Sequence, residues 1–168
     1  IKVRTSSYTR HHVNITMCKA KANGNYINSM LALREALDSG CEEALLLDNE
    51  GYVAEGSGEN VFLVKKGRLV TPELTSCLEG ITRDTVFALA KELDIEVVEK
   101  RITRDEVYIA DEAFFTGTAA EVLPIRELDG RKIGTGKRGS VTQKLQSMYF
   151  NQVLGEREEN ARWSTFVK

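Results

Sequence analysis

Residues 43–71 alternate short apolar runs with turn-forming residues, and this pattern constrains the fold more than any other stretch of the chain. Residues that favour tight turns, such as Asp48, Gly51 and Gly67, bound the runs. The pattern predicts an antiparallel sheet built from consecutive hairpins. The expected strands are Glu43–Leu47, Tyr52–Glu55, Asn60–Val64 and Arg68–Thr71.

Three segments carry apolar side chains at the 3.6-residue spacing that indicates a helix. The first begins near Tyr26 and should stop at Gly40, a good residue to follow a helix. The second begins after Gly80 with Thr82 as its expected cap, and the third covers about residues 140–154. The apolar positions are Ile27, Met30, Leu31 and Leu37 in the first helix and Val86, Leu89, Ala90 and Leu93 in the second.

The remaining segments add shorter elements. Residues 1–19 should form a loop or strand, and residues 104–109 a short helix. Further strands are expected at Ile95–Ile102, Ala113–Thr116, Val122–Leu128 and Arg131–Ile133. Together these elements predict an α/β domain in which helices flank a mixed, barrel-like sheet.

The composition suits one globular domain, with 168 residues, a formal net charge of -2 and 42% hydrophobic residues. The 23 basic and 25 acidic residues are interspersed, so neither nucleic acid nor an anionic membrane is the expected partner. Nothing resembles a membrane span or a signal sequence, and we expect a cytoplasmic protein. Because the chain opens on Ile1 rather than methionine, we expect a piece of a longer protein.

Neither the cysteines nor the histidines predict a metal site. Cys18, Cys41 and Cys77 are odd in number and lack CxxC spacing, so we expect them to be reduced and structural. His11 and His12 are adjacent, and adjacent side chains in a strand point to opposite faces.

The segment Ala20–Tyr26 surrounds Lys21 with small and turn-forming residues. Such a backbone can fold tightly and direct the amine into a cleft rather than into bulk water. A lysine amine is a nucleophile only when it is neutral, and partial burial favours the neutral form. We therefore expect Lys21 to be a partly buried nucleophile at the mouth of the first helix. The alternative is a solvated loop lysine, which we expect at Lys19.

Residues 55–62 place two carboxylates, Glu55 and Glu59, on either side of a flexible Gly-Ser-Gly turn. At the end of a strand Glu55 would point inward, and a buried carboxylate needs a cation or a hydrogen-bond donor. A protonated pyridine nitrogen is such a partner, and holding that proton lets a pyridinium ring act as an electron sink. The alternative is a pair of solvated turn glutamates.

Two further motifs, Gly80-Ile81-Thr82 and Gly117-Thr118-Ala119, place a glycine and a threonine hydroxyl where backbone N–H groups are free. The first opens a helix, an arrangement that binds phosphate or carboxylate. Two such motifs suggest a ligand with two anionic ends, although each alone resembles an ordinary cap or turn.

A glycine-rich run at residues 134–139 has the spacing of the dinucleotide-binding fingerprint. It is a weak signal, because the strand before it covers only residues 131–133 and no βαβ unit follows. A nicotinamide-binding enzyme is therefore the disfavoured alternative.

Four motifs in one order resemble the class IV pyridoxal-phosphate-dependent aminotransferases, and within them the branched-chain amino acid aminotransferases. They begin at Lys21, Glu55, Gly80 and Gly117, and the resemblance spans about residues 4–154. It implies transfer of an amino group between leucine, isoleucine or valine and 2-oxoglutarate by a homodimer. The residues of two segments, Gly58–Asn60 and Gly117–Ala120, resemble this enzyme more than the other enzymes on the same scaffold.

The resemblance also implies a domain organisation. Residues 1–168 would be the large C-terminal, cofactor-binding domain of a fold type IV, D-amino acid aminotransferase-like enzyme, with residues 1–14 as an interdomain segment. The smaller N-terminal domain of the family is absent from this sequence. We therefore expect weak transamination at best from the chain alone.

By the same resemblance, Lys21 would bind pyridoxal 5'-phosphate covalently and move the substrate proton. Tyr26 would donate to the phenolic oxygen of the cofactor, and Glu55 would pair with its ring nitrogen. The other expected ligands are Ile81, Thr82 and Thr118 for the phosphate, and Thr118 and Ala119 for the substrate α-carboxylate.

The chain departs from the family at two positions and leaves alternatives open. Asn23 stands where members usually have glycine, and Glu79 where they usually have proline. D-amino acid aminotransferases and aminodeoxychorismate lyases resemble the chain at Lys21 and Glu55 as well. A third reading is a non-catalytic fragment that only folds and associates.

Overall fold

The computed structural model describes residues 1–165 and residue 167. The helices are α1 (Ile27–Asp38), α2 (Ile81–Glu92), α3 (Arg104–Tyr108) and α4 (Ser140–Val153), with 3-10 turns η1 (Asn23–Tyr26) and η2 (Ala161–Trp163). The first strands are β1 (Lys2–Thr5), β2 (Glu43–Leu47), β3 (Val53–Gly56), β4 (Asn60–Lys65) and β5 (Arg68–Pro72). The later strands are β6 (Val97–Lys100), β7 (Glu112–Gly117), β8 (Glu121–Ile125), β9 (Glu127–Leu128) and β10 (Arg131–Lys132).

The strands form two mixed five-stranded sheets. In the first sheet, ordered β10-β9-β1-β2-β3, β1 runs parallel to β2 and β9 while β3 runs antiparallel to β2. In the second sheet, ordered β6-β5-β4-β7-β8, only β5 and β6 run parallel. The predicted mixed α/β class is confirmed, and the strands lie in two sheets where we expected one.

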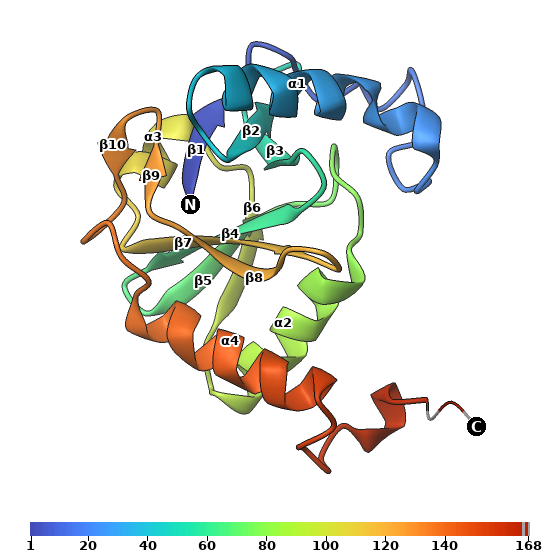
Figure 1. The fold of residues 1–168 in the computed structure, drawn as a ribbon, viewed down its shortest axis with the longest axis vertical. Coiled ribbons are helices and arrows are strands. Elements are labelled where there is room, and N and C mark those ends of the chain that lie inside the picture. The colour runs from blue at the N-terminus through green and yellow to red at the C-terminus, as the bar shows by residue number, and fades with distance from the viewer. Residues whose placement is uncertain (166, 168) are drawn as a thin grey trace.

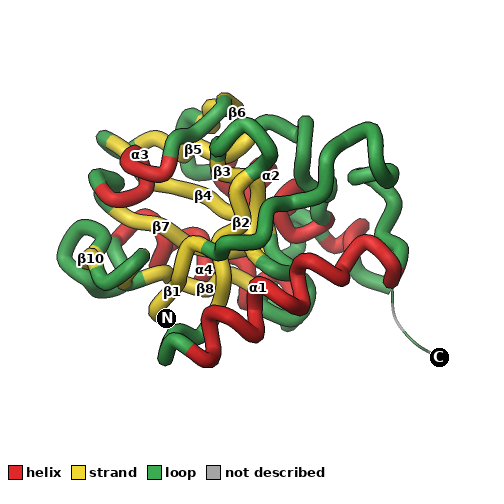
Figure 2. Tube along the Cα trace, turned by 90° about the horizontal axis from the view of Figure 1, so that it is seen from above, coloured by secondary structure: helices red, strands yellow, loops and turns green. Residues whose placement is uncertain are grey.

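Helices cover the outer faces of the two sheets (Figure 1). α1 packs on the first sheet through Ala32 and Ala36 against Ala44 and Leu46 of β2. α2 and α4 lie together on the second sheet, on the opposite side of the molecule. Viewed from above, α1 lies in front of the strands (Figure 2). None of the described helices is long and apolar enough to cross a membrane.

β4 shows how the sequence pattern fills both sides of the second sheet. Phe62 and Val64 pack with the residues of α2 and α4, whereas Val61 and Leu63 face the core between the sheets. Successive strand residues point to opposite faces, so a wholly apolar run suits a strand covered on both sides. The rigid start of β4 lies next to the turn that carries Glu59.

The predicted apolar face of α1 is wrong. The four apolar side chains predicted to form this face are 43–61% exposed, and the buried positions are Ser29, Ala32 and Ala36. Small residues allow α1 to approach β2 closely, and this turns the larger side chains outward. The exposed apolar residues of α1 are Ile27, Met30, Leu31 and Leu37.

Other expectations need smaller corrections. Gly80, in an extended conformation, is the N-cap of α2, so Thr82 lies inside the first turn and is not the cap. The strand expected over residues 95–102 is limited to β6. The strand expected over residues 122–128 is divided into β8 and β9, because the chain leaves β7 after Ile125 and pairs with β1.

Candidate active site

Four segments meet beside the two sheets and line a cavity of about 210 Å³. They are the loop before α1, the turn between β3 and β4, the start of α2 and the end of β7. A larger hollow of about 830 Å³ between α2 and α4 shares Ile81, Thr82 and Thr118 with it, but neither Lys21 nor Glu55 lines that hollow.

The cavity brings together most of the residues that the sequence singled out. Ala119 lies in the exposed turn after β7 and does not line the cavity, so its role stays a prediction. The predicted residues that line the cavity are Lys21, Tyr26, Glu55, Ile81, Thr82 and Thr118.

Lys21 lies on the exposed side of the cavity. Its Nζ donates to the Tyr26 hydroxyl at 2.8 Å. The amide of Asn25 donates to the carbonyls of Met17 and Ala20, at 3.0 and 2.9 Å, and so folds the loop that carries the lysine. The predicted partial burial is wrong, because the Lys21 side chain is exposed in this chain. Its place in the same cavity as Glu55 is confirmed.

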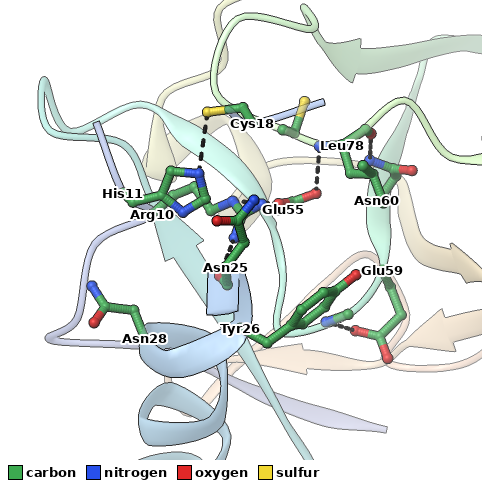
Figure 3. Close-up of polar contacts among 12 residues, drawn as sticks. Arg10, His11, Cys18, Asn25, Tyr26, Asn28, Glu55, Glu59, Asn60 and Leu78 are labelled. Atoms are coloured by element: carbon green, nitrogen blue, oxygen red, sulfur yellow. Dashed lines mark hydrogen bonds and ion pairs between the residues drawn. The ribbon is translucent and has the colours of Figure 1, made fainter. Parts of the chain in front are cut away.

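Glu55 is buried at the end of β3, as predicted, and its side chain is held on both carboxylate oxygens (Figure 3). Oε1 lies 2.6 Å from Nε of Arg10, which is itself 5% exposed. Oε2 accepts a hydrogen bond of 3.0 Å from the backbone N–H of Leu78. The protein itself therefore supplies the cation that a buried carboxylate requires.

Burial raises the pKa of the Glu55 carboxyl to about 7, while Arg10 and the Leu78 N–H act in the opposite direction. Taking a carboxylate out of water disfavours its charged form, and a cation in contact favours it. Glu55 is consequently poised to change charge near neutral pH. A further positive group in the cavity would favour its ionised form.

Asn60 fixes the segment that leads into α2. Its side-chain amide donates to the Leu78 carbonyl at 2.8 Å, so Leu78 is held through both its N–H and its carbonyl (Figure 3). Gly80 packs closely against the same side chain, because a Cβ there would lie 2.2 Å from Asn60 Oδ1. Asn60 therefore supports the backbone around Leu78 and Gly80.

Glu59 is a second carboxylate on the cavity wall. Its pKa is raised to about 7, mainly by burial and also by the nearby Glu43, while the Gly58 N–H acts in the opposite direction. That N–H donates to Glu59 Oε2 at 3.0 Å. Glu59 also fills the space beside Gly56, where a Cβ would lie 2.7 Å from Oε2. It therefore packs beneath the turn and does not protrude from it as a solvated glutamate.

The start of α2 presents backbone N–H groups to the cavity. The first turn of any α-helix leaves such groups without intrahelical partners, and they favour an anion. Ile81 is 82% exposed and Thr82 is buried, and both line the cavity. Thr116 of β7 also lines the cavity, and its buried hydroxyl has no hydrogen-bond partner among the described residues.

Sequence reasoning missed two cationic residues of the cavity. Arg10 stands in a segment without periodicity or motif, and only the demand of a buried Glu55 for a cation pointed to such a residue. Lys19, which we expected to be a solvated loop residue, also lines the cavity. The contact of each residue depends on distant segments meeting in the fold.

Comparisons with known proteins agree with this geometry. Residues 1–128 match the family described as Amino-transferase class IV. The branched-chain-amino-acid aminotransferase of Pseudomonas aeruginosa is 68% identical over the whole chain, which covers 55% of that protein. The Escherichia coli enzyme is 46% identical over 97% of the chain and 53% of its own length.

A solved structure of a T.th. branched-chain amino acid aminotransferase, complexed with N-(5'-phosphopyridoxyl)-L-glutamate, has a TM-score of 0.98 and 51% identity. The match covers 99% of this chain and 57% of that one. The chain thus spans about half the length of the relatives it matches. The chain belongs to the class IV aminotransferase family.

Proposed function

We propose that this chain is the cofactor-binding part of a pyridoxal-phosphate-dependent aminotransferase that acts on branched-chain amino acids. The observation that carries the proposal is the placement of the Lys21 amine, the Glu55 carboxylate and the start of α2 around one cavity. The similarity to branched-chain aminotransferases over the whole chain supports it. The large domain of a fold type IV enzyme, with a barrel-like arrangement of its strands, is part of the same proposal.

The groups in the cavity match those of pyridoxal phosphate in number and kind. The cavity offers an amine for an aldehyde, a buried carboxylate for a ring nitrogen and a helix N-terminus for a phosphate. A protonated ring nitrogen beside Glu55 would also favour the ionised carboxylate. When bound, the cofactor supplies the aldehyde carbon that accepts the amino group and the ring that withdraws electrons.

Each residue of the cavity would have one role toward the cofactor. Lys21 Nζ would hold the aldehyde end and then take the proton from the substrate Cα. Tyr26, which accepts a hydrogen bond from that amine, would orient it. The remaining residues bind anions: Ile81, Thr82 and Thr118 would hold the phosphate, and Thr118 and Ala119 the substrate α-carboxylate.

The proposed substrates are inferred from the similarity to branched-chain aminotransferases and not from the shape of the cavity. Leucine, isoleucine and valine with 2-oxoglutarate are the proposed pairs. Comparing turnover of L-leucine, D-alanine and aminodeoxychorismate by the full-length protein would separate this enzyme from the alternatives on the same scaffold. We expect the chain alone to transaminate weakly, because it spans about half the length of its relatives.

A homodimer is the proposed assembly, and the exposed face of α1 supports it. Ile27, Met30 and Leu31 of α1 are 58%, 61% and 43% exposed, and Ile15 and Met17 in the preceding loop are 73% and 76% exposed. Exposed apolar side chains concentrated in two consecutive segments are typical of protein interfaces. Leu31→Glu should therefore shift the mass measured by light scattering toward the monomer, while Ile109→Glu, on another exposed apolar residue, should not. The cytoplasmic location of the protein stays a prediction from its sequence.

The catalytic assignment is tested in the full-length protein with L-leucine and 2-oxoglutarate. Lys21→Ala should lower the rate by about a thousandfold or more, because both the attachment point and the proton carrier are lost. Lys65→Ala, on a lysine far from the cavity, is the matched control and should retain the rate. Comparable rates for Lys21→Ala and the wild type would refute the proposal.

A further inference from the structure

Lys19 is the second amine on the cavity wall, two residues before Lys21. Its Nζ donates to the carbonyl oxygens of Leu74 and Cys77, the latter at 3.0 Å. These partners are 55 and 58 residues away in the sequence. Although its side chain is exposed, Lys19 is bound to two carbonyls of one distant loop and is not a free solvated lysine.

The loop that Lys19 binds, residues 73–79, is the loop that positions Glu55. Its Leu78 N–H donates to Glu55, and its Leu78 carbonyl accepts from Asn60. Residue 80, the next in the chain, caps α2. A displacement of this loop would therefore disturb both the carboxylate and the anion-binding helix end.

We propose that Lys19 is a positioning residue that fastens the loop 73–79 to the segment carrying Lys21, and so holds the Leu78 N–H on Glu55. Its relevance to catalysis rests on the function proposed above, whereas the attachment itself does not. Lys19 would act through Leu74 and Cys77, without touching the substrate.

Charge makes this attachment stronger than an ordinary loop contact. An ammonium that donates to two carbonyls forms charge-assisted hydrogen bonds, which are about twice as strong as neutral ones. The described part of the structure gives Lys19 no ion pair with a carboxylate, and its hydrogen bonds go to the loop, although its charge also acts at longer range on Glu55, whose pKa it lowers. By contrast, the hydrogen bond from the Asn60 side chain to the Leu78 carbonyl joins two neutral groups.

Hydrogen exchange in the cofactor-free protein tests the attachment directly. In Lys19→Met the Leu78 amide should exchange about tenfold faster than in the wild type, as expected when a charged hydrogen bond is lost. Lys19→Arg, which keeps the charge and the donors, should stay within about threefold of the wild type. Amides of β4 and β7 should not change in either variant, which shows that the fold is intact.

Lys65→Met is the matched control, because Lys65 Nζ also donates to a backbone carbonyl, that of Ile109, outside the cavity. It should leave the exchange of Leu78 unchanged. Equal exchange of Leu78 in the wild type and in Lys19→Met would overturn the proposal, as would an equal acceleration in Lys65→Met.

Binding of pyridoxal phosphate to the full-length protein tests the consequence. Lys19→Met should raise the Kd about tenfold and Lys19→Arg should restore it, because a displaced loop weakens the contacts at Glu55 and α2 together. An unchanged Kd with faster Leu78 exchange would limit Lys19 to a structural role and refute its role as a positioning residue. If the wild type does not bind, the proposed function fails, while the exchange result still decides the attachment.

Discussion

The two sides of the cavity hold their chemical groups in different ways. On one side Lys21 is exposed and contacts the Tyr26 hydroxyl at 2.8 Å in an irregular loop. On the other side Glu55 is 6% exposed, ends a strand, and is fixed by Arg10 and Leu78. The fold therefore positions the carboxylate before any ligand arrives, whereas this chain alone does not shield the amine.

Exposed apolar side chains flank Lys21 in the sequence. Ile15 and Met17 precede Lys21, and Ile27 and Met30 follow it. A partner that binds these side chains would cover the lysine loop as well as α1. The homodimer proposed above would thus supply the shielding that the sequence led us to expect from the chain itself.

The largest expected effect on stability lies on the buried side. Glu55→Ala should lower the free energy of unfolding by about 3–5 kcal/mol, because it leaves the Arg10 charge buried without a partner. Arginine cannot shed its proton, so this charge cannot be neutralised. Urea unfolding monitored by circular dichroism measures the effect.

Arg10→Met should cost less, about 1–3 kcal/mol, since the Glu55 left behind can take up a proton. The control is the exposed pair of Arg34 and Asp38 on α1, with Nη2 and Oδ1 3.0 Å apart. Arg34→Ala should change stability by no more than about 0.5 kcal/mol. Equal costs for Glu55→Ala and Arg34→Ala would remove the contrast between the two sides.

The two raised carboxyl pKa values predict that stability falls as the pH rises. Glu55 and Glu59 each have a pKa of about 7 in the folded state, against an ordinary value of 4.5. Between pH 4.5 and pH 7 the folded state therefore binds more protons than the unfolded state. Their contribution is complete below pH 4.5 and is lost as the pH rises through 7. The total loss should be on the order of 3 kcal/mol for Glu59, which has no ion-pair partner among the described residues.

Glu59→Gln should remove its share of that pH dependence. Glutamine keeps an acceptor for the Gly58 N–H but cannot become charged. The variant should match the wild type near pH 4.5 and exceed its stability at pH 8, as measured by denaturant midpoints across the range. Parallel pH curves for the two proteins would refute the assignment.

Close packing around Asn60 predicts an intermediate effect. Gly80→Ala should cost about 1–3 kcal/mol, because the added Cβ would lie 2.2 Å from an oxygen that is tied to Leu78 through its amide group. Gly24→Ala, on the exposed side, meets no atom within 4 Å and should be neutral or slightly stabilising. Thermal unfolding of the two variants gives the comparison.

The smallest effect should come from the exposed side itself. Tyr26→Phe removes the acceptor for Lys21 but leaves no buried group unpaired. It should change the free energy of unfolding by no more than about 0.5 kcal/mol. A loss as large as that of Glu55→Ala would show that the lysine loop is as rigidly held as the buried side.

Periodicity predicted the elements well but not the faces that they bury. The position of α1 was predictable within two residues, whereas its buried face was not, because small Ala32 and Ala36 rather than large apolar residues contact β2. β4, whose apolar run is continuous, was predicted correctly. Pattern alone cannot say which side of an amphipathic helix a sheet will accept.

The candidate site divides in the same way. Motifs of consecutive residues identified Lys21, Glu55 and the start of α2, because local turn and helix-end chemistry depends on neighbours in sequence. Arg10 and Lys19 act across distant segments, so no local pattern marked them. The exposure of Lys21 was likewise not predictable, since it depends on what the rest of the fold covers.

The central claim is that Lys21, opposite Glu55, is the amine that captures an aldehyde-bearing cofactor. Borohydride reduction of the full-length protein with pyridoxal phosphate, followed by peptide mass spectrometry, tests it directly. The account predicts that the added mass lies on Lys21 and that Lys21→Arg abolishes it. Labelling of Lys19 instead, or labelling spread over surface lysines, would contradict the account.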